Sequence, residues 1–442
     1  MGLFALLLLI AFVLIAYHSG GHDLLSPWFL LCFVFCASFC IVLINYANWD
    51  VKINYLFIVY VCTALASFGV GCAIKGKPLT KQEARLPLLF TKRQRKNYPA
   101  LSFAVLSVGL LALYAFKILS DNYVASSFSA TLRAIYDKSV KGYSPGILFT
   151  QMREVIVAIA YISAYKLLLK MFGRKGNTPY FLVVVPIVCF LFLVLLTTDR
   201  NIFLRFAIYF LCLYIVLYRA HCKKRHVNAR ILKWLIGFGI CIVAVFFIMG
   251  RLKQYQSDLF NSISIYAGSG LYNFNLWLVD FQGPLLYGKA VFSTLMRVVQ
   301  AVFGKIGVHL NLPALDRFDP FITYTSPNGY EYSSNIYTAL KPFVNDFGYF
   351  GVIFFPFIMG VFYQWLYRWA RRNKSGFSLI LYAALVYPII FYPILDQFFA
   401  RLTLGVVYEL VWLAIIYEVA FGTRQPHGSA VGMQTAQGVN HG

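Results

Sequence analysis

The sequence predicts an all-α polytopic membrane protein with about 11 transmembrane helices. Of its 442 residues, 60% are hydrophobic and only 12% are charged, whereas a soluble protein averages about 25% charged residues. Apolar runs of roughly 20 residues, the length that a helix needs to cross a bilayer, recur along the chain. The predicted spans are residues 2–17, 27–46, 54–74, 99–119, 147–171, 179–197, 202–219, 232–250, 348–369, 377–394 and 402–420.

The direction of each span follows from the basic residues, of which 21 out of 39 fall in four short loops. This positive-inside pattern assigns the loops to the cytoplasm, with the N-terminus outside and the C-terminus inside. It also explains the net charge of +23 by contact with anionic membrane lipid rather than nucleic acid. The first three spans have the least support, because no Lys or Arg lies between residues 18 and 26. The four loops are residues 75–96, 170–175, 219–233 and 368–374.

The predicted topology divides the chain into four parts. Residues 1–250 hold eight spans, residues 251–347 form a large outer loop, residues 348–420 hold three spans, and residues 421–442 are a disordered cytoplasmic tail. A loop of this length is usually functional. Its apolar stretches have helical spacing, so we expect a folded outer subdomain with amphipathic helices lying on the membrane. No positively charged region precedes the first span, which we interpret as a retained helix rather than a cleaved signal peptide.

Chemistry in this chain has to come from charged residues at the outer ends of the spans, because P-loop, GxSxG, HExxH and GxGxxG motifs are absent. Arginine forks match phosphate oxygens, and ionisable groups at membrane depth are functional candidates. We expect no metal, since Cys32, Cys36 and Cys40 share a helix face without a nearby His or carboxylate. The charged candidates are Arg153 with Glu154, Asp199 with Arg200, Arg251, Lys253, Lys341, Asp346, Asp396 and Arg401.

Several of these charges also have simpler interpretations. Arg153 and Glu154 are equally consistent with an ion pair between helices, and Asp396 and Arg401 with a clasp at a helix end. Arg205 lies one turn into a span and is expected to snorkel to the outer interface. Asp199 is either a partner of Arg200 or an ordinary turn residue.

The general base remains open among residues of the outer loop. His309 is the only histidine there, and a histidine suits proton transfer near neutral pH, although a surface or packing role is the simpler interpretation. Asp316 and Glu331 are alternatives. Arg317 and Asp319 are candidates for binding sugar hydroxyls, and aromatic side chains can stack on sugar faces. The aromatic candidates are Trp277, Tyr324, Tyr330, Tyr332 and Tyr337.

Four segments resemble Wzy-type O-antigen polymerases, the oligosaccharide repeat-unit polymerases of bacterial envelopes. They are "TTDRNIFLRFAIYF", "FFIMGRLKQY", "FQGPLLYGKAVFSTLMRVV" and "SNIYTALKPFVNDFGYFGVIFFPFIMG". The last is the most specific, with a basic residue, then Asp-Phe-Gly, then Gly before an apolar run. By motif the resemblance covers only about 195–210 and 245–360.

The resemblance implies a GT-C-like glycosyltransferase fold in the bacterial inner membrane, with a large periplasmic loop. It implies block transfer of a growing glycan from undecaprenyl diphosphate onto a new lipid-linked repeat unit, without cofactor, and a possible Wzz-type chain-length regulator as partner. Arg200 and Arg251 match the family's functional arginines, whereas Lys341 stands where the family often has Arg. The residues expected to bind substrate are Arg153, Lys253, Arg317, Tyr337, Lys341, Asp346 and Arg401, and those expected in catalysis are Arg200, Arg251, His309 and Glu331.

Three other functions remain open. An O-antigen ligase, or another lipid-linked glycan transferase, shares the fold class and leaving group. A lipid-linked oligosaccharide flippase would have charges lining a cavity in both halves and commonly shows related halves, of which we see no sign. A scaffold protein would hold these polar clusters by accident.

Overall fold

The computed structural model describes residues 1–74, 98–124, 126–140, 143–172, 178–197, 199–221, 237, 259–309, 319, 321–325, 329, 331–372 and 376–421. In this part of the chain nine helices are long and apolar enough to cross a membrane. The sheet content there is one two-stranded hairpin. The prediction of an all-α polytopic membrane protein is therefore confirmed. The predicted span at 232–250 lies, apart from Gly237, outside the described residues.

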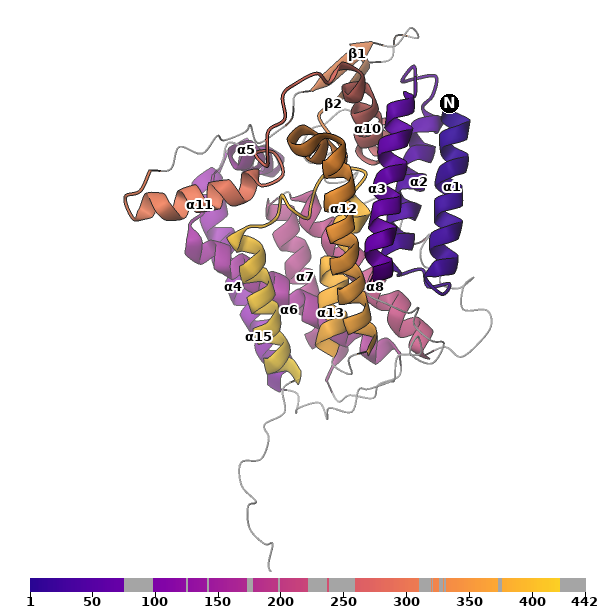
Figure 1. Cartoon of the computed structure of the whole chain (residues 1–442). Coiled ribbons are helices and arrows are strands. Elements are labelled where there is room, and N and C mark those ends of the chain that lie inside the picture. The colour runs from indigo at the N-terminus through magenta and orange to yellow at the C-terminus, as the bar shows by residue number, and fades with distance from the viewer. Residues whose placement is uncertain are drawn as a thin grey trace, which may run out of the picture.

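The nine long helices run side by side and form the body of the molecule (Figure 1). We call the end at which α1, α6, α8 and α15 begin the outer end, following the predicted topology, and the opposite end the inner end. Their bounds are α1 Gly2–Ser19, α2 Pro27–Ile44, α3 Tyr55–Ile74, α4 Tyr98–Asn122, α6 Ile147–Met171, α7 Tyr180–Thr197, α8 Arg200–His221, α12 Leu340–Arg372 and α15 Leu404–Phe421.

Close packing of α3 against α12 depends on two glycines. A Cβ atom on Gly71 would lie 2.3 Å from the carbonyl oxygen of Phe357, and one on Gly360 would lie 2.2 Å from that of Phe68. Both distances are far below van der Waals contact, so the two backbones touch directly. Small residues at such a crossing are how transmembrane helices approach closely, since lipid supplies no hydrophobic drive for their association.

The predicted span at 377–394 is broken into two short helices, α13 (Gly376–Leu385) and α14 (Tyr387–Phe391). Pro388 lies in the first turn of α14, where its missing N–H group costs nothing. The chain then runs without regular structure to α15. We call residues 392–403 the buried loop, after Tyr392, Pro393 and Phe399, which are buried there. The Tyr392 carbonyl accepts bonds from the Ala339 N–H and the Thr338 hydroxyl, both at 2.9 Å. Irregular backbone is tolerated inside such a bundle only when protein satisfies its polar groups in this way.

The chain re-enters the bundle through a bent helix, which begins earlier than predicted. α12 begins at Leu340, eight positions before the predicted start at residue 348. Gly348 has φ 58° and ψ −141°, so the helix turns sharply at the position where the apolar run begins. Glycine adopts this conformation without steric cost.

The described part of the predicted outer loop contains α10 (Leu259–Asp280), α11 (Ser293–Lys305) and a hairpin of β1 (Ile322–Thr325) and β2 (Glu331–Ser334). The strands pair antiparallel, with Ile322 opposite Ser334. α10 lies beside α2, because the Ser38 hydroxyl donates to the Ala267 carbonyl at 2.5 Å. This segment is thus partly embedded among the helices. A further short helix, α5 (Phe128–Val140), follows α4 at the outer end.

The inner end is held by Asp23, which lies between α1 and α2. Its buried carboxylate pairs with Arg219 of α8 at 3.0 Å and with Arg371 of α12 at 2.6 Å, and it accepts a bond from the Tyr367 hydroxyl. We call these four residues the Asp23 clasp. It places the loop after the first helix at the same end as the last turns of α8 and α12. The predicted alternation of the spans requires this arrangement.

Candidate functional site

A buried ion pair joins α8 to α15. Arg205 is 6% exposed and Glu409 is 8% exposed, and the Arg205 Nη2 group donates to both carboxylate oxygens of Glu409. The Arg205 guanidinium also lies 4.7 Å from the centre of the Tyr387 ring. The prediction that Arg205 snorkels to the interface is therefore wrong, because a carboxylate on a distant span neutralises its charge inside the bundle.

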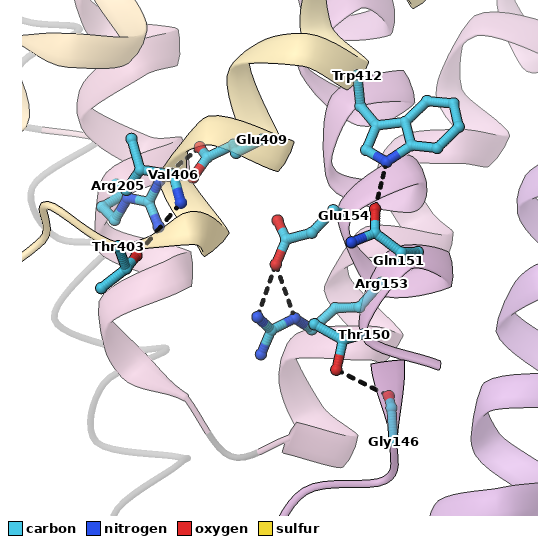
Figure 2. A network of polar contacts seen from close by, with 10 residues as sticks. All are labelled: Gly146, Thr150, Gln151, Arg153, Glu154, Arg205, Thr403, Val406, Glu409 and Trp412. Atoms are coloured by element: carbon cyan, nitrogen blue, oxygen red, sulfur yellow. Dashed lines mark hydrogen bonds and ion pairs between the residues drawn. The ribbon is translucent and has the colours of Figure 1, made fainter. Parts of the chain in front are cut away.

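A second ion pair reaches from α6 toward the first (Figure 2). The Arg153 guanidinium donates to Oε1 of Glu154 through Nη2 at 2.6 Å and through Nε at 3.2 Å. The expected pair thus forms, but within one helix rather than between helices. The Glu409 carboxylate also interacts electrostatically with the guanidinium groups of Arg153 and Arg401. The two ion pairs therefore belong to one electrostatic group.

Arg401 enters this group from the buried loop. Its Nη1 donates to the Tyr387 hydroxyl at 3.1 Å, and its guanidinium lies 5.5 Å from the centre of the same ring. Tyr387 therefore contacts two arginines, Arg205 and Arg401. The break between α13 and α14 positions this tyrosine at the start of a short helix, and the buried loop returns Arg401 to it.

Asp396 is not the partner of Arg401, so the predicted clasp between them is wrong. Its carboxylate accepts the N–H groups of Phe398, Phe399 and Ala400 at 2.8–3.1 Å and so closes the turn of the buried loop. Burial raises the pKa of Asp396 to about 6, although the three N–H bonds act in the opposite direction.

We call Arg153, Glu154, Arg205, Tyr387, Arg401 and Glu409 the arginine cluster. Its three guanidinium groups and two carboxylates leave one net positive charge on a group of side chains that are buried or partly buried. Neighbouring bonds hold the helices in place: Trp412 of α15 donates to Gln151 of α6 at 2.7 Å, and the Val406 N–H donates to the Thr403 hydroxyl at 3.3 Å (Figure 2). A preorganised cationic site of this kind suits an anion that needs several donors.

The turn that contains Arg200 lies beside the arginine cluster. Asp199 accepts the N–H groups of Asn201 and Ile202 at 2.9 and 3.4 Å, so it caps the first turn of α8. Arg200 donates to the Tyr266 hydroxyl of α10 at 3.3 Å. Asp199 is also within the electrostatic reach of Arg153. Arg200 is thus held at the outer rim of the cluster, partly exposed.

Lys341 belongs to a separate group at the start of α12. It is 4% exposed and pairs with Asp319 at 2.8 Å. Its ammonium lies 3.4 Å from the centre of the Tyr337 ring and 5.8 Å from that of Trp277. A compact ammonium enclosed by two rings and a carboxylate has little freedom to bind a further anion. The predicted substrate residues Tyr337 and Lys341 therefore contact each other, and neither bonds to the arginine cluster in the described part of the chain.

Asp346 links the outer segment to the re-entry of α12. Its buried carboxylate accepts the N–H groups of Ala290 at 2.9 Å and Val291 at 2.7 Å. This geometry corresponds to an orienting role for Asp346.

The predicted general bases are not gathered at the cluster. His309 and Glu331 are exposed, and neither forms a hydrogen bond or ion pair with the cluster arginines among the described residues. Glu331 lies on β2 opposite Thr325. Arg251, Lys253, Asp316 and Arg317 lie outside the described residues. In the described ranges no group of three or more His, Cys, Asp or Glu residues is placed to hold a metal ion.

The sequence reading missed Glu409 and Tyr387. Glu409 had a detectable signal, because it is a carboxylate in the second turn of the last apolar span, and such residues are functional candidates. Tyr387 had none, since 31 tyrosines are spread through the chain. Its role depends on the helix break, which Pro388 marks locally, and on contacts with arginines that no local motif indicates.

Comparison of the chain with protein-family models, curated proteins and solved structures gave no match. The resemblance to oligosaccharide repeat-unit polymerases therefore rests on the four sequence segments alone.

Proposed function

We propose that the protein is a membrane glycosyltransferase of the O-antigen polymerase type. It would transfer a growing glycan from undecaprenyl diphosphate onto a new lipid-linked repeat unit at the periplasmic face of the bacterial inner membrane. The observation that carries the proposal is the arginine cluster, in which Arg153, Arg205 and Arg401 converge from three segments with one net positive charge.

The chemistry of the donor matches this charge. When the bond between the anomeric carbon and the diphosphate breaks, negative charge builds on the departing diphosphate oxygen. Arg401 and Arg153 are only partly buried, so their guanidinium groups can reach a lipid diphosphate and stabilise that charge. Arg205, paired with Glu409, holds Tyr387 and thereby orients Arg401. Arg200 at the rim is positioned to guide the diphosphate toward the cluster.

The acceptor supplies a sugar hydroxyl, which attacks the anomeric carbon and loses its proton to a base. The product is one new glycosidic bond and free undecaprenyl diphosphate. His309, Asp316 and Glu331 remain the sequence candidates for the base. Each would have to approach the cluster with the bound glycan, since His309 and Glu331 are exposed at other parts of the outer end.

The proposal is tested by the lipopolysaccharide of a strain that lacks its own copy of the gene. Complementation with Arg153→Ala, Arg401→Ala, Arg200→Ala or Arg251→Ala is expected to leave mostly core with a single repeat unit. Arg133→Ala is the matched control, because Arg133 lies at the outer end on α5 and its side chain is 54% exposed. It should restore the full ladder. Long ladders from normally expressed cluster variants would contradict the proposal.

The same gel separates the main alternative. An O-antigen ligase has the same fold class and leaving group, and its loss leaves core without any repeat unit. Core carrying one unit therefore supports the polymerase, and bare core supports the ligase.

A further inference from the structure

One helix of the outer segment has an apolar face without a protein partner in the described part of the chain. α11 has no buried residue, although it is strongly amphipathic. The side chains of Leu295, Val302 and Phe303 are 39–48% exposed, and Ile306, just after the helix, is 69% exposed. Successive helical residues are rotated by about 100°. These four side chains therefore share one face, and Arg297 and Gly304 lie on the opposite one.

The orientation of α11 sets it apart from the spans. It runs across their direction, level with the outer end of α15, and extends past the side of the bundle (Figure 1). The predicted topology places the outer ends of the spans where the hydrocarbon of the bilayer gives way to lipid headgroups, and α11 lies level with one of these ends (Figure 1). A crosswise amphipathic helix at that depth can bury its apolar face in lipid without crossing the membrane.

The start of α11 is fixed at this depth. The N–H groups of Leu286 and Tyr287 donate to the carbonyls of Asn345 and Asp346 at 2.9 and 3.1 Å. The Asp346 carboxylate then binds the N–H groups of Ala290 and Val291. Both sets of bonds tie the segment to the part of α12 just before its turn at Gly348. The position of α11 along the direction of the spans is therefore fixed by its bonds to the start of α12.

Charge supplies an independent indication of what covers this helix. Residues 281–315 contain Lys289, Arg297 and Lys305 but no Asp or Glu. Basic residues on an amphipathic helix and beside it favour contact with anionic headgroups. A soluble protein partner would not require such a helix to lie level with the ends of the transmembrane spans.

We propose that α11 lies in the outer surface of the membrane, with Leu295, Val302, Phe303 and Ile306 among the acyl chains and Lys305 at anionic headgroups. The helix holds the outer segment at the lipid boundary. This placement does not depend on the proposed glycosyl transfer.

Photo-crosslinking of the full-length protein tests the placement. Benzoylphenylalanine replaces Phe303 or, on the opposite face, its neighbour Gly304, where an added Cβ atom meets nothing within 4 Å. Val411 on α15, 49% exposed, serves as the lipid-facing reference, and the buried Leu213 on α8 as the lipid-free one. In nanodiscs that contain phosphatidylglycerol and phosphatidylcholine, the intact mass after irradiation reports any lipid adduct.

The Phe303 position is expected to give lipid adducts at a yield near that of Val411 and several times that of Gly304. An adduct with the mass of a second chain would show that another copy covers α11 and would overturn the proposal. So would the absence of a lipid adduct at Phe303 while Val411 gives one. In the Lys305→Glu variant the share of phosphatidylglycerol among the adducts should fall. An unchanged share would contradict the headgroup contact.

Discussion

Arg205 and Glu409 lie 204 positions apart in the chain and form a buried ion pair between α8 and α15. The pair fixes the outer half of the last span against the interior of the bundle. It also places the Arg205 guanidinium against Tyr387, whose hydroxyl accepts a bond from Arg401. One ion pair thus supports both the packing of α15 and the geometry of the candidate site.

Removal of one partner should destabilise the protein strongly, because the other charge is left buried. We expect Glu409→Ala or Arg205→Ala to cost about 3–5 kcal/mol. The double substitution Arg205→Met with Glu409→Met should recover most of that loss, since no charge remains unpaired. Thermal unfolding in detergent measures the effect. If the double variant is no more stable than either single variant, the pair is not the source of the loss.

Two substitutions at Tyr387 should separate the contribution of its ring to the positioning of Arg401 from that of its hydroxyl. Tyr387→Phe keeps the ring beneath both guanidinium groups and loses only the bond to Arg401. Tyr387→Ala loses both. Under the proposed function, lipopolysaccharide gels should show shorter O-antigen chains for Tyr387→Phe and a single repeat unit for Tyr387→Ala, at comparable amounts of folded protein. Identical ladders for the two variants would show that the ring does not position Arg401.

The backbone contact between α3 and α12 predicts a steep response to small changes at Gly360. Gly360→Ala places a Cβ atom 2.2 Å from the Phe68 carbonyl oxygen, so the helices must separate. We expect a loss of about 1–3 kcal/mol, as for overpacked cores. Gly109→Ala on α4 is the control, because nothing lies within 4 Å of its added Cβ. Equal melting midpoints for the two variants would contradict the packing.

The raised pKa of Asp396 predicts that the stability of the folded protein falls as the pH rises. Its folded pKa of about 6 exceeds the ordinary value of 3.8, so the folded state binds the proton more tightly than the unfolded state. The resulting stabilisation is complete below pH 3.8 and is lost as the pH passes through about 6. Asp396→Asn stays neutral and keeps one oxygen for the N–H groups of Phe398 and Phe399, but it loses the acceptor for Ala400. The melting temperature of this variant should therefore lack the fall with rising pH that Asp396 gives the native protein, and a difference between the two proteins that is independent of pH would contradict this account.

The Asp23 clasp predicts that the carboxylate of Asp23 contributes far more to the stability of the fold than the exposed carboxylate of Asp50. Asp23→Asn leaves Arg219 and Arg371 beside each other without a counter-ion, and we expect a loss of about 3–5 kcal/mol. Asp50→Asn removes an exposed pair, in which the side chains of Asp50 and Lys52 are 46% and 82% exposed. Such pairs contribute about 0–1 kcal/mol. Thermal unfolding of both variants under the same conditions measures the two losses of stability. Equal losses would show that the clasp is weak.

Most of the spans could be predicted from sequence, because a bilayer imposes one length and one composition on every helix that crosses it. The predicted runs at 2–17, 147–171 and 402–420 correspond to α1, α6 and α15 within a few residues. Pro388 is a local signal of the break at 386, but the residues around it are as apolar as those of a continuous span. The path of the chain after α14 has no such local signal, because the Tyr392 carbonyl finds its partners at Thr338 and Ala339, far along the chain.

The sequence predicts part of the candidate site. Arg153 and Arg401 are predictable because charges near membrane depth are rare, and both belong to the arginine cluster. Arg205 is not, because its position one turn into a span is the usual one for a snorkelling residue. Only Glu409 reverses that interpretation, and its contact with Arg205 depends on how α8 and α15 pack.

The Asp23 clasp and the pair of Arg205 and Glu409 lie near opposite ends of α8, roughly 20 Å apart at 1.5 Å per residue. The clasp joins three segments with charged bonds, whereas the outer end is built from short helices and the buried loop. The clasp and the ion pair therefore brace α8 near both of its ends, the inner end to α12 and to the loop after α1, and the outer end to α15. Sliding of α8 along its neighbours would break one of these two groups of charged bonds.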